Sequence, residues 1–125
     1  FLVTPAGLAA VLDWEFAHWG DPMEDLAWLC VRDWRFGRID RPVGGICGRK
    51  RFYDAYAAAS GREVDPAAVH FWEVLGNLRW GVGAVVQGLR YGGGEADLEL
   101  LAIARRSAEM EYEALRLIEL GPPNL

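Results

Sequence analysis

The sequence predicts a mainly α-helical chain that opens with a short β-hairpin and continues in about four helices. Two short apolar runs flank a turn at the start, an Asp-Pro pair stands before each of two later helical stretches, and apolar residues recur there at helical spacing. The chain has 125 residues, of which 52% are hydrophobic. A chain of this size and composition folds around its own core without a disulfide framework.

The first twelve residues predict the hairpin. Phe1–Val3 and Leu8–Leu12 are apolar runs of strand length, and residues 4–7 separate them. Pro5 stands at the second turn position, where its fixed φ suits a type I turn, and Gly7 stands at the fourth. The second strand therefore ends at a charged and aromatic cluster, Asp13–Glu15.

Capping residues locate the helices. Asp21 and Asp65 each precede a proline, which is favoured at the first helical position because its missing N–H has no helical partner there. Glu24 completes a capping-box-like pattern with Asp21, and Gly61 suits the end of a helix. The first of four helices is expected to begin at residue 21. The other three are expected from about 46 to 60, from 66 to about 88, and from about 95 to 120.

The third of these helices is apolar on most sides, which predicts a central, buried position. It contains Gly76, Gly81 and Gly83, and a glycine inside a helix costs about 1 kcal/mol relative to alanine. Close approach of a neighbouring segment would offset that cost. Tryptophans at helical spacing are expected in the core: Trp28, Trp34, Trp72 and Trp80.

Charge and composition exclude some classes of protein. The formal net charge is -5, which argues against a nucleic-acid partner, and no apolar run has the length of a membrane span. The short basic run Arg49–Arg51 is interpreted as a solvated helix face, in preference to a contact with phosphate or an acidic cofactor tail. Cys30 and Cys47 match no metal or redox spacing, so we expect reduced thiols in a cytoplasmic protein.

An acid at the end of an apolar strand is well placed to reach a ligand, and Asp13 has that position. Mg²⁺ takes carboxylate oxygens at about 2.1 Å and retains water, so one protein carboxylate plus substrate phosphates forms an ordinary site for it. The alternative is that Asp13 only caps the turn after the strand. The pattern alone favours this alternative.

The residues after the strand resemble the aminoglycoside phosphotransferase family, within the choline-kinase-like and protein-kinase-like superfamily. The resemblance rests on three short motifs in order, Asp13–Glu15, Gly20–Pro22 and Asp25–Ala27. It implies part of the C-terminal lobe of a kinase-like fold, with residues 1–20 as metal-site hairpin and turn and residues 21–125 as helical subdomain. It also implies ATP and Mg²⁺ as cofactors, and phosphoryl transfer to a hydroxyl of a small molecule.

The resemblance implies a role for individual residues. Asp13 would be the ligand of the Mg²⁺ that bridges the terminal phosphates of ATP, and Asp21 would cap the following helix. Asp25 would be a buried acid that braces the catalytic loop; if it faces solvent, it is only a first-turn acid favoured by the helix dipole. The candidates for the substrate cleft are Trp14, Glu15, His18 and Trp19, although a solvated or packing role is the favoured alternative for His18.

The catalytic base of that family has no counterpart in this sequence. The His-Gly-Asp type of loop with its following Asn is absent, as is the nucleotide-binding lobe with its Lys. Because the sequence opens at Phe1, inside an apolar run, we expect a longer protein with the base Asp and a metal-binding Asn just upstream. The missing N-terminal lobe is then a partner in cis, and these 125 residues alone are expected to be inactive.

A non-catalytic helical protein-interaction module is the alternative, in which Asp13–Glu15 is only a turn and aromatic faces bind a partner. For the enzyme, the expected partners are a nucleotide and a small hydroxyl acceptor. Related families phosphorylate aminoglycosides, choline, homoserine, sugars or hydroxyacyl thioesters, and the acceptor stays open here. An exposed apolar face makes a homodimer a further expectation. The acids of the last helix are expected to be solvated: Glu99, Glu109, Glu111 and Glu113.

Overall fold

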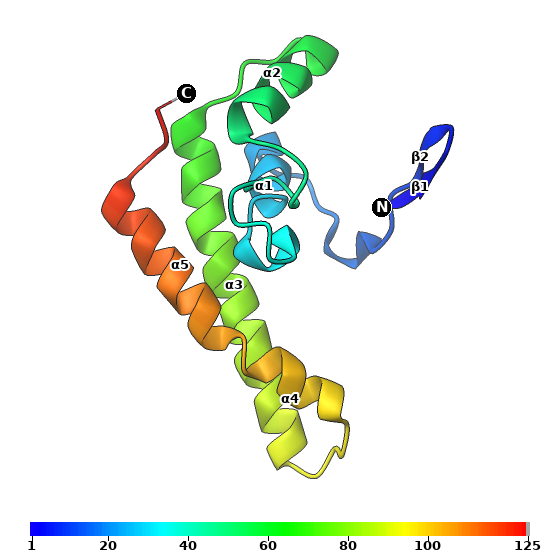
Figure 1. Cartoon of the computed structure of the whole chain (residues 1–125), viewed down its shortest axis with the longest axis vertical. Helices are drawn as coiled ribbons and strands as arrows, with labels where there is room; N and C mark the ends of the chain where they lie inside the picture. Colours follow the sequence, from blue (N-terminus) through cyan, green and yellow to red (C-terminus); the bar gives the residue numbers. More distant parts are fainter. Residues whose placement is uncertain (125) are drawn as a thin grey trace.

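The computed structural model describes residues 1–124 and confirms a mainly helical fold that opens with an antiparallel hairpin (Figure 1). A long helix, α3, runs through the molecule, and the other helices pack beside it. The elements are β1 (Leu2–Thr4), β2 (Gly7–Ala10), the 3₁₀ helix η1 (Trp14–Phe16), α1 (Pro22–Trp28), the 3₁₀ helix η2 (Arg32–Arg35), α2 (Arg49–Ser60), α3 (Pro66–Gly92), α4 (Leu98–Ala104) and α5 (Ser107–Leu120).

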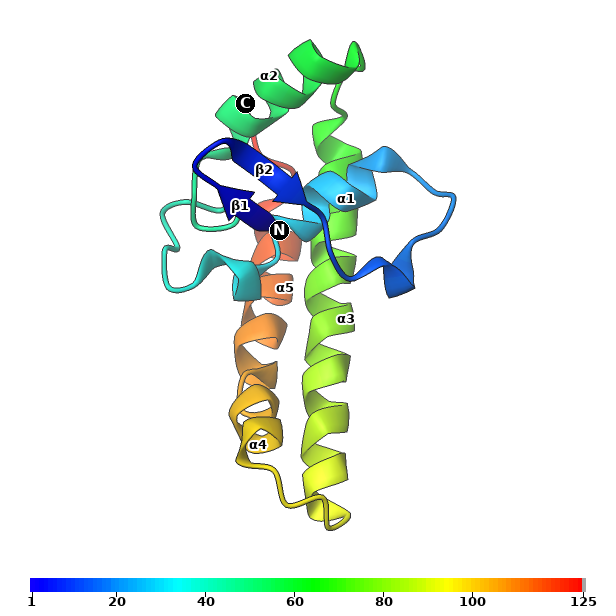
Figure 2. The same cartoon turned by 90° about the vertical axis from the view of Figure 1, so that its right-hand side faces the viewer.

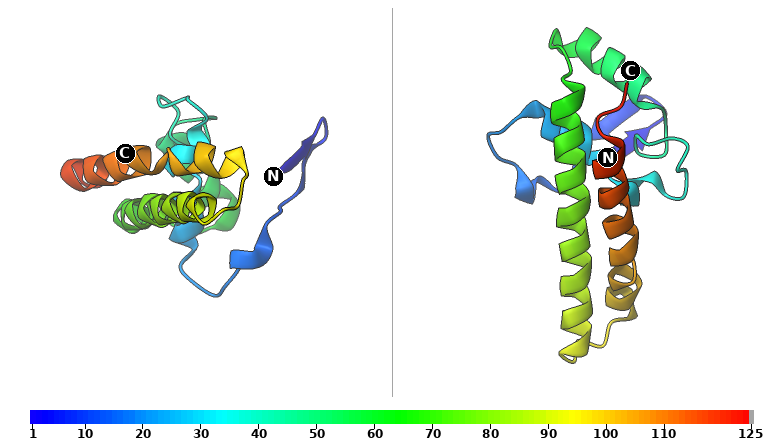
Figure 3. Two further views of the ribbon diagram at one scale, coloured as in Figure 1. Left: turned by 90° about the horizontal axis from the view of Figure 1, so that it is seen from below. Right: turned by 90° about the vertical axis from the view of Figure 1, so that its left-hand side faces the viewer.

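The hairpin projects away from the helices (Figure 3). Thr4 pairs with Gly7 across a two-residue turn, and Gly7 has a φ of 116°, a backbone conformation that favours glycine. Few of its side chains are covered by the rest of the chain. Its large apolar side chains are exposed, among them Phe1, Leu2, Val3 and Leu8.

Helix α1 begins where the Asp-Pro pair predicts. The Asp21 carboxylate accepts a hydrogen bond from the Met23 backbone N–H at 2.9 Å, and proline occupies the first helical position. The capping-box-like pattern is not completed, because Oε2 of Glu24 lies 3.1 Å from Nε2 of His18. Asp21 therefore sets the start of the helix without help from the Glu24 side chain.

Helix α1 is short and ends at Trp28. The backbone N–H of Arg32 donates to Oδ1 of Asn77 on α3 at 3.2 Å. This tertiary hydrogen bond replaces the helical bond that the Arg32 N–H would make if α1 continued. The chain then continues into η2.

The buried apolar residues fall into two sets. One set joins α1, α2 and the start of α3, and the other joins α3 to α4 and α5, which runs antiparallel to α3 (Figure 2). Within residues 1–124, no helix combines the length and the apolar character that a bilayer crossing requires. The buried apolar residues of the two sets include Met23, Leu26, Ala27, Tyr53 and Val69, and Ala84, Leu100, Met110, Ala114 and Leu117.

The last predicted helix is divided into α4 and α5. Asp97 caps α4 by accepting from the Glu99 N–H at 2.9 Å. The break falls at Arg105 and Arg106, and Nη1 of Arg106 lies 2.6 Å from Oδ1 of Asp33 on η2. The helices α4 and α5 pack on successive parts of α3. The break between them coincides with the ion pair of Arg106 with Asp33, a residue distant in sequence.

Helix α3 is central, because α1, α4 and α5 pack against it, but it is buried on one side only, so the expected burial on most of its sides is wrong for this chain. One face carries buried residues such as Val69, Asn77 and Ala84 and packs against the neighbouring helices. Along the opposite face, exposed apolar residues alternate at spacings of four and three, and we call this face the α3 stripe. It comprises Phe71, Leu75, Leu78, Val82, Val85 and Leu89.

Two glycines of α3 have opposite surroundings. A Cβ added at Gly76 would lie 2.8 Å from Cγ2 of the buried Val31, whereas at Gly83 it would meet nothing within 4 Å. Gly76→Ala is expected to lower the free energy of unfolding by about 1–3 kcal/mol, because a stiff valine must move. Gly83→Ala is expected to raise it by up to about 1 kcal/mol through helix propensity. Urea denaturation of the two variants checks this, and stabilisation by both would contradict it.

Candidate functional site

Asp13 lies where β2 leads into η1, in a backbone conformation that is uncommon for residues other than glycine. Its φ of 63° and ψ of 54° are left-handed, a region that Asp tolerates better than most side chains. Its carboxylate is exposed and makes no capping hydrogen bond. The interpretation that Asp13 only caps the turn therefore has no support in the geometry.

Neighbouring groups hold the backbone around Asp13. Nε1 of Trp14 donates to the carbonyl of Val11 at 2.8 Å, and the N–H of Ala17 donates to the carbonyl of Trp14 at 2.9 Å. The first bond spans Asp13, and the second closes η1, which follows it. The indole bond thus bridges the turn that contains Asp13, and the carboxylate of Asp13 makes no capping hydrogen bond.

The residues after Asp13 form an exposed segment. Trp14, Glu15 and Trp19 are exposed, and Trp19 is fully accessible at 103%. The segment contacts α3 through Arg79, whose guanidinium carbon lies 4.8 Å from the centre of the Phe16 ring. The proposed cleft residues therefore lie on one connecting segment, on the solvent side of the helices.

His18 belongs to the same segment but is engaged locally. Its Nδ1 lies 2.9 Å from the carbonyl oxygen of Phe16, and its Nε2 lies 3.1 Å from Oε2 of Glu24. The Phe16 carbonyl, and after it the charge of Glu24, raise the pKa of His18 above its ordinary value. This geometry gives His18 a role in fastening the segment to α1.

Asp21 and Asp25 differ in their surroundings. Oδ1 of Asp21 caps α1, and its Oδ2 accepts from Nε1 of Trp72 at 3.0 Å, which ties α1 to α3. Asp25 lies in the first turn of α1 and is exposed. Residues 1–124 therefore do not form the buried environment expected for Asp25, since they include no loop for it to brace.

The residues present fit a metal ion only as a partial site. Among residues 1–124, no three His, Cys, Asp or Glu side chains gather closely enough to hold an ion. Asp13 does not line either of two hollows that residues 1–124 form among the helices. An exposed, uncapped carboxylate suits a Mg²⁺ that takes its other ligands from nucleotide phosphates, water and further protein groups.

Sequence reasoning missed a buried ion cluster between η2, α3 and α5. Arg35 is 1% exposed, Glu73 1% and Glu113 0%. Nη2 of Arg35 lies 3.0 Å from Oε1 of each glutamate and donates to the carbonyl of Cys30 at 2.8 Å. The expectation that Glu113 is solvated is wrong, because η2 brings a guanidinium to it from a distant part of the sequence.

Three further arginines complete this cluster. Nη2 of Arg49 lies 2.6 Å from Oε1 of Glu73, so the interpretation of Arg49 as part of a solvated face is wrong. Nη1 of Arg32 lies 3.0 Å from Oε2 of Glu113, and Nη2 of Arg116 lies 2.7 Å from its Oε1. Only the pair of Arg116 with Glu113 is local, at a spacing of three on α5, whereas partners such as Arg32 and Glu113 are 81 residues apart.

The two buried carboxyls respond differently to this surrounding. Burial acts to raise the pKa of Glu113, but hydrogen bonds from Arg116 and the charge of Arg35 outweigh it and lower the pKa to about 2. Burial raises the pKa of Glu73, and here the charges of Arg49 and Arg35 only partly oppose it. Glu113 is therefore the carboxylate whose charge the fold stabilises.

The low pKa of Glu113 predicts a loss of stability in acid. Because its folded pKa lies below the unfolded value, its contribution is present above about pH 4.3 and is lost as the pH falls toward 2. The shift corresponds to roughly 3 kcal/mol. Glu113→Gln is expected to flatten the fall in the free energy of unfolding between about pH 5 and pH 2, as measured by denaturation.

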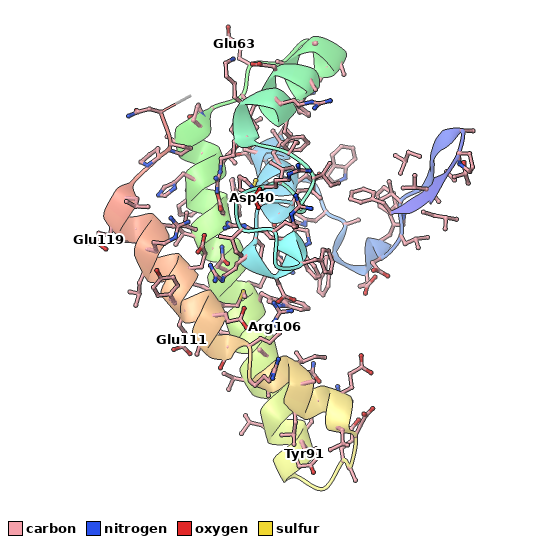
Figure 4. The ribbon with its side chains drawn as sticks, viewed as in Figure 1. Asp40, Glu63, Tyr91, Arg106, Glu111 and Glu119 are labelled. Carbon is pink, nitrogen blue, oxygen red and sulfur yellow. The ribbon has the colours of Figure 1, made fainter. Side chains whose placement is uncertain are left out.

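The control for this experiment lies on the same helix. Glu119 is exposed near the end of α5 (Figure 4), and Glu119→Gln should keep the acid dependence of the unchanged chain. The raised pKa of Glu73 acts in the opposite direction, so its contribution is present at low pH and is lost as the pH rises. An acid dependence that is the same with and without the Glu113 carboxyl would contradict the account.

Comparison with known proteins agrees with the resemblance seen around Asp13. The family model described as Phosphotransferase enzyme family (APH) matches residues 1–72, more than half of the chain. The matched residues run from the hairpin through α1 and α2 into the start of α3. No curated protein and no solved structure shows significant similarity to the chain. The chain therefore belongs to the phosphotransferase enzyme family.

Proposed function

We propose that this chain is the C-terminal, metal-binding part of an ATP- and Mg²⁺-dependent enzyme that phosphorylates a hydroxyl of a small molecule. The longer protein is called the parent enzyme below. Membership of the phosphotransferase family supports the reaction class. The observation that carries the assignment of Asp13 is its free carboxylate in a left-handed turn, since residues in sparsely populated conformations cluster at functional sites.

The chain's own contribution is to position charge. When bound, ATP and Mg²⁺ supply the phosphoryl group and neutralise its charge. Asp13 would hold the ion, and its backbone is kept in place by Trp14, so little rearrangement is needed at the moment of reaction. The exposed side chains of Trp14, Glu15 and Trp19 would face the acceptor.

The remaining parts of the site belong to other residues of the parent enzyme. We place the catalytic base and a second metal ligand in a segment N-terminal to Phe1, and the phosphate-cradling lobe beyond that segment. The exposed apolar side chains of the hairpin support a further protein segment packed against it. The 125 residues alone should therefore show no turnover. The reduced thiols of Cys30 and Cys47 support a cytoplasmic enzyme.

The α3 stripe favours a second candidate, a helical interaction module. Its apolar residues alternate at spacings of four and three and are exposed along several turns, which is the pattern of a helix that packs against another helix. A second copy of the chain is the partner we propose for this case. Mg²⁺-dependent nucleotide binding separates the two candidates, because a pure interaction module has none.

The proposed function is tested with the purified parent enzyme. ATP consumption and phosphorylated product are measured with aminoglycosides, choline, homoserine, sugars and hydroxyacyl thioesters, in the presence and absence of a Mg²⁺ chelator. We expect product with one acceptor class and its complete loss on chelation. Product formation that persists without a divalent ion, or no ATP consumption with any acceptor, would contradict the proposal.

A further inference from the structure

An open hollow of about 530 Å³ lies between η2, the start of α2 and α5. Four arginines from three elements line it, and we call it the arginine hollow. Figure 1 shows α5 and the hairpin on opposite sides of α3, and no residue that lines the hollow belongs to the Asp13 segment. Its lining residues are Arg32, Arg35, Ile39, Asp40, Pro42, Arg49, Tyr112 and Arg116.

Positive charge exceeds negative charge around the arginine hollow. The four guanidinium groups pair with two buried carboxylates, Glu73 and Glu113. The other acids nearby are weak partners: Oε2 of the half-exposed Glu109 lies 3.9 Å from Nε of Arg32, and the exposed Asp40 lies 3.8 Å from Arg38 and Arg41. An excess of partly buried positive charge favours the binding of an anion that compensates it.

Two of the arginines also have hydrogen-bonding groups without partners. Nε of Arg32 and Nε of Arg49 are buried and make no hydrogen bond within residues 1–124. The side chains of Arg32 and Arg49 are only 20% and 17% exposed, so water reaches them poorly. Buried N–H groups normally have an acceptor, so the guanidinium groups of Arg32 and Arg49 keep unused donor capacity beside the hollow.

Apart from the exposed Asp40, the remaining wall of the hollow is largely apolar. Ile39 and Pro42 lie on the loop before α2, and the ring of Tyr112 lies on α5 with Arg32 stacked 5.8 Å from its centre. The volume is in the range of small-molecule sites. A ligand that fits has an anionic head for the guanidinium groups and a small organic part for this wall.

We propose that the arginine hollow binds the dianionic phosphate group of a small phosphorylated organic molecule. The planar fork of a guanidinium matches two oxygens of a phosphate, so several arginines that converge on one space suit this group. The cluster of opposite charges orders the arginine side chains before the ligand arrives, which lowers the entropic cost of binding. The proposal is independent of catalysis at Asp13.

The test measures binding of inorganic phosphate and of phenyl phosphate to the chain by calorimetry, at constant ionic strength. We expect saturable binding of both, with phenyl phosphate tighter because its ring contacts the apolar wall. Arg116→Gln removes one charged donor and should weaken binding about tenfold or more. Glu113 keeps Arg32 and Arg35 in that variant, so the fold should persist, as circular dichroism can check.

Two variants make the result specific. Arg62→Gln removes the same charge from an exposed position outside the hollow and should leave both affinities unchanged. Tyr112→Ala should weaken phenyl phosphate and leave inorganic phosphate unaffected. The proposal is overturned if neither anion binds saturably, if Arg62→Gln and Arg116→Gln have the same effect on affinity, or if Tyr112→Ala changes neither affinity. The arginines then serve only to hold the helices together.

Discussion

Asp13→Ala is expected to lower the turnover of the parent enzyme by about 10³-fold or more, because it removes an oxygen ligand from the metal ion that neutralises the phosphates. Asp13→Asn keeps the shape of the side chain without its charge and should fail to the same degree. Asn also tolerates the left-handed backbone found at this position. The loss in that variant therefore reports on charge rather than on the turn.

The control for Asp13 is an acid on the connection between α2 and α3. Glu63 is exposed and far from the hairpin (Figure 4), so Glu63→Gln should leave turnover within about twofold of the unchanged enzyme. Steady-state kinetics at saturating ATP and Mg²⁺ give the comparison. Turnover of Asp13→Asn close to that of Glu63→Gln would remove Asp13 from the metal site.

Arg35→Ala is expected to lower the free energy of unfolding by about 3–5 kcal/mol, the usual effect of removing one partner from a buried ion pair. Arg35 compensates Glu73 and Glu113 and donates to the carbonyl of Cys30. Its loss leaves two buried carboxylates with less compensation and one carbonyl without its donor. Since a domain is stable by only about 5–15 kcal/mol, this loss is a large fraction of the total.

Two variants show whether charge causes this loss. Arg35→Met fills a similar volume without a charge and should be nearly as unstable as Arg35→Ala, as measured by urea denaturation. Lys50→Ala breaks only the exposed pair of Lys50 with Asp54 and should change stability by less than about 1 kcal/mol. Full stability of Arg35→Met would mean that Arg35 acts through packing alone.

Local signals in the sequence predicted much of the fold. The Asp-Pro pairs at Asp21 and Asp65 mark the starts of α1 and α3, and both carboxylates accept first-turn N–H groups. Gly61 ends α2 with a φ of 69°. Such caps depend on residues that are close in sequence, so the sequence alone predicts them.

Features that depend on distant partners were not predictable in this way. The end of α1 depends on Asn77, the division of the last helix is accompanied by the pair of Arg106 with Asp33, and the burial of Glu113 depends on Arg35. The sequence marks none of these residues as different from other charged or polar side chains. The tertiary fold decides which charges are buried, and pattern alone does not.

The candidate site was predictable only in part. The end of an apolar strand and the resemblance around it identified Asp13, whereas its left-handed backbone and the bond from Trp14 to Val11 came from the structure. The arginine hollow had no sequence signal beyond Arg49 in a short basic run. Its four arginines lie in three separate stretches of the chain, and only folding brings them together.

The most direct test of the metal-site assignment is binding of Mn²⁺, in place of Mg²⁺, to the parent enzyme with a non-hydrolysable ATP analogue, followed by electron paramagnetic resonance. The account predicts a protein-bound Mn²⁺ signal that requires the analogue, is lost in Asp13→Ala and persists in Glu63→Gln. A bound signal of equal affinity in Asp13→Ala would contradict it.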